Sequence, residues 1–123
     1  MKELLIIGTG GFIGAICRYI INSIFLTKFG LPIGTFVVNL LGSFIVGFVM
    51  YSSVLINIPM EYRLLLITGF CGALTTFSTF SYESFLLVEN GENFKFITNI
   101  IINVFGCLIM VFIGRYIALS IFK

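Results

Sequence analysis

The stretch LLIIGTGGFIGA, residues 4–15, decides the fold because it is compatible with two unrelated kinds of protein. Glycines after a short apolar run are typical of the phosphate-binding turn of a dinucleotide-binding domain. Glycines along an apolar helix instead let a second helix pack closely within a membrane. The first kind of domain also needs an acidic residue about 20 positions later to bind the ribose, but the next acidic residue after Glu3 is Glu61. The stretch is therefore predicted to be a membrane helix.

The composition of the whole chain supports this interpretation. Of its 123 residues, 59% are hydrophobic and 10% are charged, and the mean hydropathy is +1.18. Soluble domains have about 25% charged residues, and a small soluble protein with fewer would lack the polar groups to cover its surface. We therefore expect lipid to be the solvent for most of the surface of this protein.

The polar residues exclude several classes of function. The net charge is only +2 and the lysines and arginines are scattered, so no nucleic-acid partner is expected. The chain has no histidine and no aspartate, which excludes histidine-based metal sites and Ser–His–Asp triads. The three cysteines lie in apolar segments without CxxC spacing and are interpreted as small packing residues. We expect no enzymatic activity.

Four apolar segments are long enough to cross a bilayer, which takes about 20 helical residues. They are predicted at about 4–26, 33–56, 64–88 and 96–121. Because the connections between them are short, consecutive helices are expected to lie antiparallel and adjacent. The predicted fold class is an all-α, polytopic membrane protein in which residues 1–123 form a single membrane domain.

Small and polar residues form stripes along one face of three predicted helices, because residues four apart share a helical face. The stripes consist of Gly10, Gly14, Arg18 and Asn22 in the first span, Thr35, Asn39, Ser43, Gly47 and Tyr51 in the second, and Asn99, Asn103, Gly106 and Gly114 in the fourth. Such stripes hold helices together in lipid through close packing and hydrogen bonds. They also suit a polar pathway, and the recurrence of the stripes with their asparagines favours this second interpretation.

Lysine and arginine are distributed almost evenly between the two predicted sides of the membrane. An excess of these residues on one side orients most membrane proteins, and this chain has almost none. We therefore expect the chain to insert in both orientations. Opposite copies would then pair as an antiparallel homodimer about a two-fold axis in the membrane plane.

The third span contains the least regular stretch, GFCGALTTFSTFSYESF at residues 69–85. Its second half is crowded with hydroxyl side chains, which compete for backbone hydrogen bonds and bend or interrupt helices. Gly72 precedes them and supplies flexibility. One interpretation is a helix broken at mid-membrane, whose freed carbonyl groups bind a cation. The other is a continuous helix whose hydroxyls bond back to their own turn.

Phe77 and Phe80 lie three residues apart in this stretch and share a helical face. Packing is the default explanation for any phenylalanine in a chain that contains 15 of them. The edge of an aromatic ring is positive, however, and hydroxyls flank both residues here. Two ring edges, with the amide of Asn39, would line a narrow path for a small anion.

Two charged side chains within the spans need partners. Arg18 and Glu83 are predicted to lie towards the same side of the membrane. Ionisable residues within a membrane usually pair or line a water-filled cavity. The two residues therefore form either a structural ion pair or part of an aqueous vestibule in which Arg18 concentrates anions.

Three segments together resemble the Fluc/CrcB family of fluoride channels. They are GTFVVNLLGSFIVG at 34–47, GFCGALTTFSTFSYE at 69–83 and GAICRY at 14–19, and the similarity extends over essentially the whole chain. The resemblance implies an antiparallel, dual-topology homodimer with two separate pores in the plasma membrane of a prokaryote. It also implies passive, selective export of fluoride, which protects the cell from fluoride toxicity.

The resemblance also implies roles for individual residues. Phe77 and Phe80 match the pore phenylalanines and Asn39 matches the pore asparagine. The side chains expected along the fluoride pore are those of Asn39, Thr76, Phe77, Ser78, Thr79, Phe80 and Asn103. Those expected at the vestibule are Arg18, which matches a vestibule arginine, and Glu83.

A structural sodium ion is the one cofactor that the resemblance implies. Gly72 and Thr75 match positions whose backbone carbonyl groups hold this ion at the dimer axis. Ala73 departs from the family pattern, which usually has a second glycine there, so the backbone at the break is less closely specified than the pore side chains.

Two other functions compete with the fluoride channel. A small dual-topology, proton-coupled multidrug-type exporter needs a membrane-embedded acid, but the first two spans contain none and Glu83 lies near the end of its span. A non-conducting membrane scaffold would use the polar stripes only to hold helices together.

Overall fold

The computed structural model describes residues 1–25 and 30–122, and these residues are mainly helical. The helices are α1 (Lys2–Ile24), α2 (Ile33–Ile56), α3 (Met60–Arg63), η1 (Leu64–Cys71), α4 (Gly72–Leu74), α5 (Phe77–Glu89) and α6 (Asn93–Phe122). Four stretches are long and apolar enough to cross a membrane, and they are Lys2–Ile24, Ile33–Ile56, Met60–Glu89 and Asn93–Phe122. The prediction of an all-helical protein with four membrane spans is confirmed.

The ends of these stretches differ in places from the spans expected from hydropathy. The predicted end of the first span, at residue 26, lies outside the described residues. The third stretch begins at Met60, directly after its N-cap residue Pro59, because proline is tolerated at the start of a helix but disrupts its interior. The helix includes the polar residues Glu61 and Arg63 before the apolar segment, so hydropathy alone predicts a span that is too short.

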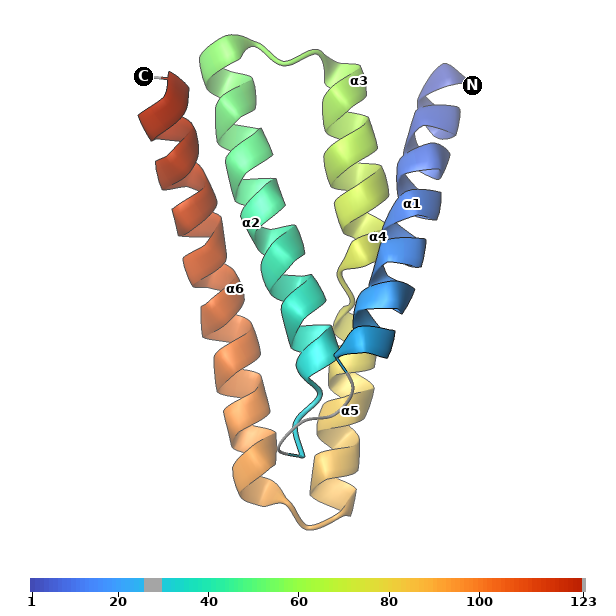
Figure 1. The fold of residues 1–123 in the computed structure, drawn as a ribbon, viewed down its shortest axis with the longest axis vertical. Coiled ribbons are helices and arrows are strands. Elements are labelled where there is room, and N and C mark those ends of the chain that lie inside the picture. Colours follow the sequence, from blue (N-terminus) through green and yellow to red (C-terminus); the bar gives the residue numbers. More distant parts are fainter. Residues whose placement is uncertain (26–29, 123) are drawn as a thin grey trace.

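The four stretches run up and down as a bundle (Figure 1). Both chain termini lie at one end together with the connection between α2 and α3, and the connection between α5 and α6 lies at the other end. The most extensive contacts join α1 to η1 and α2 to α6, while α5 packs against α6. Consecutive spans are therefore not always the closest neighbours, because α1 packs mainly against the third stretch.

Glycines explain why α1 packs so closely against η1. A Cβ atom added to Gly69 would lie 3.0 Å from the Cα atom of Gly10, and one added to Gly14 would lie 3.0 Å from the carbonyl carbon of Phe70. The two backbones are therefore in direct contact, and both glycines of α1 are buried. The interpretation of Gly10 and Gly14 as packing residues is confirmed.

The same device joins α2 to α6. A Cβ atom added to Gly47 would lie 2.9 Å from the Cα atom of Val111, and one added to Gly114 would lie 3.2 Å from the carbonyl carbon of Gly47. Lipid provides no hydrophobic drive for helix association, so close backbone contact of this kind is a main source of stability. These two glycine contacts set the position of α2 relative to α6, and both helices carry polar residues of the predicted stripes.

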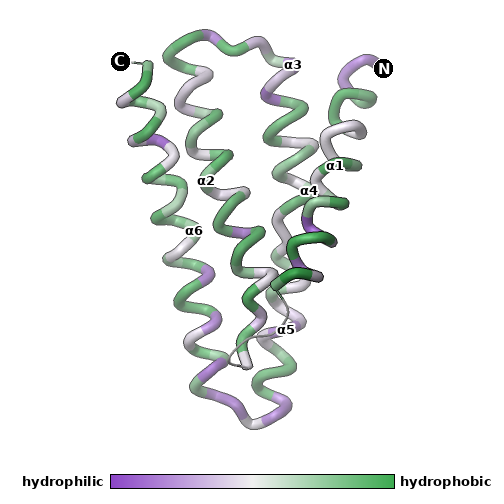
Figure 2. Tube along the Cα trace, in the orientation of Figure 1, coloured by the Kyte–Doolittle hydropathy of each residue, from purple (hydrophilic) through white to green (hydrophobic). Residues whose placement is uncertain are grey.

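Most of the outer surface is apolar. Figure 2 shows hydrophobic residues along the lengths of the helices and hydrophilic residues concentrated near the connections and the ends. Large apolar side chains such as Phe12 (69% exposed), Phe105 (59%) and Phe112 (67%) point away from the bundle. A surface of this kind faces lipid, and the protein is a multi-pass membrane protein.

The third stretch leaves helical geometry at two residues. Thr75 (φ −79°, ψ 155°) and Thr76 (φ −151°, ψ 114°) are extended, and they separate α4 from α5. A continuous helix through the hydroxyl-rich segment is therefore wrong. Gly72 has ordinary helical angles (φ −60°, ψ −31°) and Ala73 lies within α4, so the interruption begins after both of them and needs no glycine.

Candidate functional site

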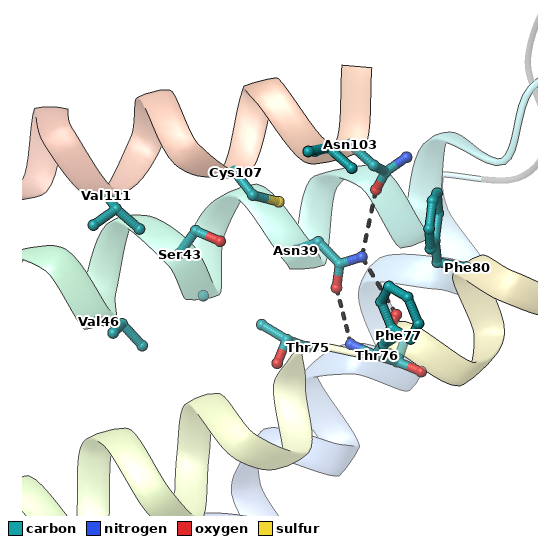
Figure 3. Close-up of a pocket in the computed structure, with 12 residues that line it drawn as sticks. Asn39, Ser43, Val46, Thr75, Thr76, Phe77, Phe80, Asn103, Cys107 and Val111 are labelled. Carbon is teal, nitrogen blue, oxygen red and sulfur yellow. Dashed lines mark hydrogen bonds between the residues drawn. The ribbon is translucent and has the colours of Figure 1, made fainter. Parts of the chain in front are cut away.

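Asn39 of α2 holds the interruption in the third stretch. Its Oδ1 atom accepts a hydrogen bond from the Thr76 amide at 2.9 Å, and its Nδ2 atom donates to the Thr76 carbonyl oxygen at 3.4 Å (Figure 3). A helix would satisfy that amide internally, and a buried unpaired amide is costly. One side chain thus replaces the backbone partners that Thr76 loses, and the two hydrogen bonds stabilise the extended backbone.

The hydroxyl group of Thr76 starts the following helix. Its Oγ1 atom accepts a hydrogen bond from the Thr79 amide at 3.2 Å, which is the usual arrangement at a helix N-cap. The same atom donates to Thr79 Oγ1 at 3.0 Å and lies 3.3 Å from Ser78 Oγ. Three of the hydroxyls predicted along the pore therefore form one cluster at the first turn of α5.

A chain of buried amide groups continues from Asn39 into the bundle. Asn39 Nδ2 donates to Asn103 Oδ1 at 3.4 Å, and Asn103 Nδ2 donates to Asn99 Oδ1 at 3.0 Å. Asn99 Nδ2 then donates to Ser84 Oγ at 3.0 Å. Asn99, Asn103 and Ser84 are all at most 5% exposed, so this polar network lies inside the protein. It connects α2, α6 and α5.

The hydrogen-bond network includes both side-chain amides that were predicted to line the pore. The Nδ2 atoms of Asn39 and Asn103 each make two hydrogen bonds within the chain, although those of Asn39 are long at 3.4 Å. Long hydrogen bonds are weak and easily exchanged for a better acceptor. Asn39 is therefore the more available donor of the two in this conformation.

A groove of about 350 Å³ opens beside these residues. Five of the predicted pore residues line it, namely Asn39, Thr76, Phe77, Phe80 and Asn103. Gly42, Ser43 and Cys107 also line it, and Figure 3 shows Ser43 and Cys107 on neighbouring helices near Asn39. The predicted hydroxyls of Ser78 and Thr79 lie next to it through their contacts with Thr76.

The two predicted pore phenylalanines lie together but in different surroundings. Their ring centroids are 5.5 Å apart and the ring planes are inclined by 50°. Phe80 is 8% exposed and packs within the bundle, whereas Phe77 is 77% exposed in the single chain. The groove and the exposed ring of Phe77 are continuous with the outer surface of the protein.

Arg18 and Glu83 do not form an ion pair. Arg18 Nη1 donates to the Thr75 carbonyl oxygen at 3.5 Å, while Glu83 Oε1 accepts a hydrogen bond from Thr35 Oγ1 at 2.9 Å. The other carboxylate oxygen of Glu83 is buried without a partner. The structural ion pair considered from the sequence is therefore wrong, and each residue has a separate polar partner.

Gly72 and Thr75, the two residues whose carbonyl groups are expected to hold a sodium ion, lie at or just before the interruption. The Thr76 amide donates to Asn39, so it does not satisfy the carbonyl group of Gly72 four residues earlier. The carbonyl oxygen of Thr75 accepts only the long hydrogen bond from Arg18 among the described residues. Carbonyl oxygens freed by a broken helix are typical sodium ligands, so Gly72 and Thr75 fit such an ion.

Two residues of the site were not identified from the sequence as part of it. Ser84 links Asn99 to the carbonyl oxygen of Phe80, to which it donates at 2.7 Å. Gly42 lets the side chain of Thr75 approach α2, because an added Cβ atom would clash with the methyl group of Thr75. The spacing of the α2 stripe points to Asn39 but gives no sign of these contacts between helices.

Comparisons with known proteins agree on one family. A family model described as "CrcB-like protein, Camphor Resistance (CrcB)" matches residues 5–115. Curated proteins named "Fluoride-specific ion channel FluC" are similar to the chain over its full length. One from Methanococcus aeolicus is 71% identical and covers all of both chains, and one from Methanocaldococcus jannaschii is 63% identical over 100% of this chain and 99% of its own. One from the bacterium Shewanella halifaxensis is 41% identical over 99% of this chain and 100% of its own.

Proposed function

The chain belongs to the CrcB family, and from this membership we propose that it is a fluoride-selective ion channel that exports fluoride passively and so reduces its toxicity in the cell. The observation that carries the proposal is the groove at the interrupted span, where Asn39, Phe77 and Phe80 meet. Full-length similarity to curated fluoride channels supports it further.

The proposed pore uses the groups around the groove to replace the water that surrounds fluoride. Donors come from the amides of Asn39 and Asn103 and from the hydroxyl cluster of Thr76, Ser78 and Thr79. The positive edges of the Phe77 and Phe80 rings complete the path. Arg18 and Glu83 belong to the vestibule in this proposal, where the positive charge of Arg18 raises the local concentration of anions.

The proposed assembly is an antiparallel homodimer in the plasma membrane of a prokaryote. The near absence of a charge bias supports insertion in both orientations. The exposure of Phe77 and the open side of the groove support a second copy that completes the pore wall. A C-terminal tag accessible from both faces of sealed vesicles is the expected result, and a tag on one face only would contradict the proposal.

The proposed sodium site lies where the interrupted spans of two copies meet at mid-membrane. Gly72 and Thr75 supply the carbonyl oxygens, and Gly72 has an open side that suits the approach of a second chain, because an added Cβ atom would meet only the Ile67 carbonyl oxygen, at 3.8 Å. A bound cation offsets the repulsion between freed carbonyl groups and holds the two interruptions together. Its role is structural.

Ion efflux from liposomes tests the proposal directly. The purified full-length protein is reconstituted with internal fluoride or, as a control, internal chloride, and efflux is started with a potassium ionophore that balances charge. We expect rapid release of fluoride, no release of chloride, and no dependence on a proton gradient. Exchange of a dye cation driven by a proton gradient would favour the multidrug-type exporter, and silence in both assays would favour the scaffold.

A further inference from the structure

A positively charged side chain, that of Arg18 on α1, lies beside the interruption. We infer that the Arg18 guanidinium and the sodium ion are alternative partners of the Thr75 carbonyl oxygen, so that Arg18 sets how much sodium the dimer needs to assemble. This inference rests on the sodium site of the proposed function. It assigns Arg18 a positioning role at the interruption that is separate from its role in attracting anions.

The contacts of Arg18 leave its charge directed at that carbonyl group. The guanidinium is half-buried and donates to Thr75 O at 3.5 Å. It forms no ion pair with a described carboxylate, since the two ion pairs there join Lys2 to Glu61 and Lys95 to Glu92. Glu83, the acid predicted on the same side of the membrane, is engaged by Thr35. The Thr75 carbonyl oxygen is the one described acceptor of Arg18.

The position of Arg18 follows from the packing of α1 against η1. Gly10, Gly14 and Arg18 lie four residues apart on one face of α1, and the two glycines bring the backbones into contact. The arginine then lies one turn beyond that contact, beside the interruption that follows α4. Because the backbone is fixed so closely, only the flexible side chain of Arg18 is free to move away from Thr75.

Two cations do not share one carbonyl group easily. With an effective dielectric constant of about 20, a guanidinium group a few ångströms away weakens the binding of a sodium ion by more than about tenfold. The length of the Arg18 hydrogen bond shows that the arginine is a weak partner, which a sodium ion with several carbonyl ligands displaces. Without sodium, Arg18 gives the Thr75 carbonyl a donor and the interruption persists in the single chain.

The test measures assembly against sodium concentration. Two pools of full-length protein, labelled at the N-terminus with a donor or an acceptor dye, are mixed in detergent, and energy transfer is followed while sodium chloride replaces choline chloride at constant ionic strength. We expect Arg18→Met to assemble at a sodium concentration more than about tenfold lower than the unmodified protein needs. Arg18→Lys, which keeps the charge, is expected to remain close to the unmodified protein.

Arg115→Met is the matched control, because it removes an arginine from another face of the bundle. Arg115 lies on α6 with its guanidinium carbon 4.9 Å from the centre of the Tyr51 ring. The control is expected to leave the sodium requirement unchanged. Helical content and melting temperature are measured for each variant, and Arg18→Gln replaces Arg18→Met if the methionine variant does not fold.

The outcomes separate this inference from the proposed function. An unchanged or increased sodium requirement in the neutral Arg18 variants would overturn the competition. Assembly of the unmodified protein that ignores sodium, together with normal fluoride efflux, would overturn both the competition and the sodium site but leave the channel standing. If the unmodified protein released fluoride and chloride equally from liposomes, that result would contradict the proposed channel function independently of the sodium measurements.

Discussion

Asn39 shows how one side chain is both a structural and a functional candidate. The stripe along the second span points to this residue, but its two hydrogen bonds with the Thr76 backbone depend on how α2 packs against the third stretch. A pattern within one helix contains no information on which backbone groups another helix leaves unpaired. The residue was predictable from the sequence, and its partner was not.

Replacement of Asn39 tests this double role. Asn39→Ala leaves the buried amide of Thr76 unpaired, which costs about 1–3 kcal/mol of folding free energy. We expect a lower melting temperature and a strong loss of fluoride efflux. Asn39→Asp keeps the acceptor for the Thr76 amide but loses the donor, so it should retain more stability than alanine while still losing flux. Equal stability of the two variants would contradict the hydrogen bond to Thr76.

The phenylalanine pair allows packing to be separated from conduction. Phe80→Leu preserves an apolar side chain in a buried position and should cost less folding free energy than the ~3–5 kcal/mol of a Phe→Ala truncation. It removes the ring edge, so we expect fluoride efflux to fall while the protein stays folded. Phe77→Ala, at an exposed ring, should change the stability of the single chain little and reduce efflux. Normal efflux in both variants would exclude the two rings from the pore.

At the scale of the helices, hydropathy predicted the four spans well because the length of a membrane helix is set by the bilayer. The position of the interruption was harder to predict. Gly72 was expected to supply the flexibility for the interruption. It is helical, however, and the backbone becomes extended only at Thr75 and Thr76. The extended backbone of Thr76 is held by two hydrogen bonds with Asn39 of α2, so the cause lies outside the segment.

The glycines of α1 provide a matched pair for testing helix contact. A Cβ atom on Gly10 would clash with the backbone of η1, whereas one on Gly8 would meet nothing within 4 Å. We expect Gly10→Ala to lower the melting temperature of the purified protein by separating the two backbones. Gly8→Ala should be neutral or slightly stabilising, because alanine is the better helix former by about 1 kcal/mol. Similar losses in both variants would show that helix propensity, not contact, dominates.

At the scale of the whole molecule, one side of the single chain exposes features that would suit contact with a second copy. The groove is open, and Phe77 and Gly72 face outwards. The antiparallel dimer was predicted from the even distribution of positive charge along the sequence. These exposed features support that proposal and do not depend on charge. The contacts of the proposed dimer would join side chains of two separate chains, and no pattern along one helix predicts such pairs.

Gly72→Val separates assembly from folding. Within one chain the added side chain meets little, so the variant protomer should keep its helices, although valine is a weaker helix former than alanine. If a second copy approaches at Gly72, as proposed, the side chain should block it. We expect a shift from dimer to monomer in crosslinking experiments, and a dimer with normal sodium dependence would contradict the proposed cation site. Gly91→Ala is not a suitable control because Gly91 has φ +73°, so Gly8→Val serves instead.

The short length of α5 has a consequence for how the protein enters the membrane. Its 13 residues extend about 20 Å, which is less than the roughly 30 Å hydrocarbon layer. The extended residues before it separate it from the apolar η1, and its own surface carries many hydroxyls. The third stretch, Met60–Glu89, therefore crosses the bilayer only if α5 and the helices before the interruption enter it together. Synthesis arrested before Phe77 should accordingly yield a fragment in which this stretch does not span the membrane.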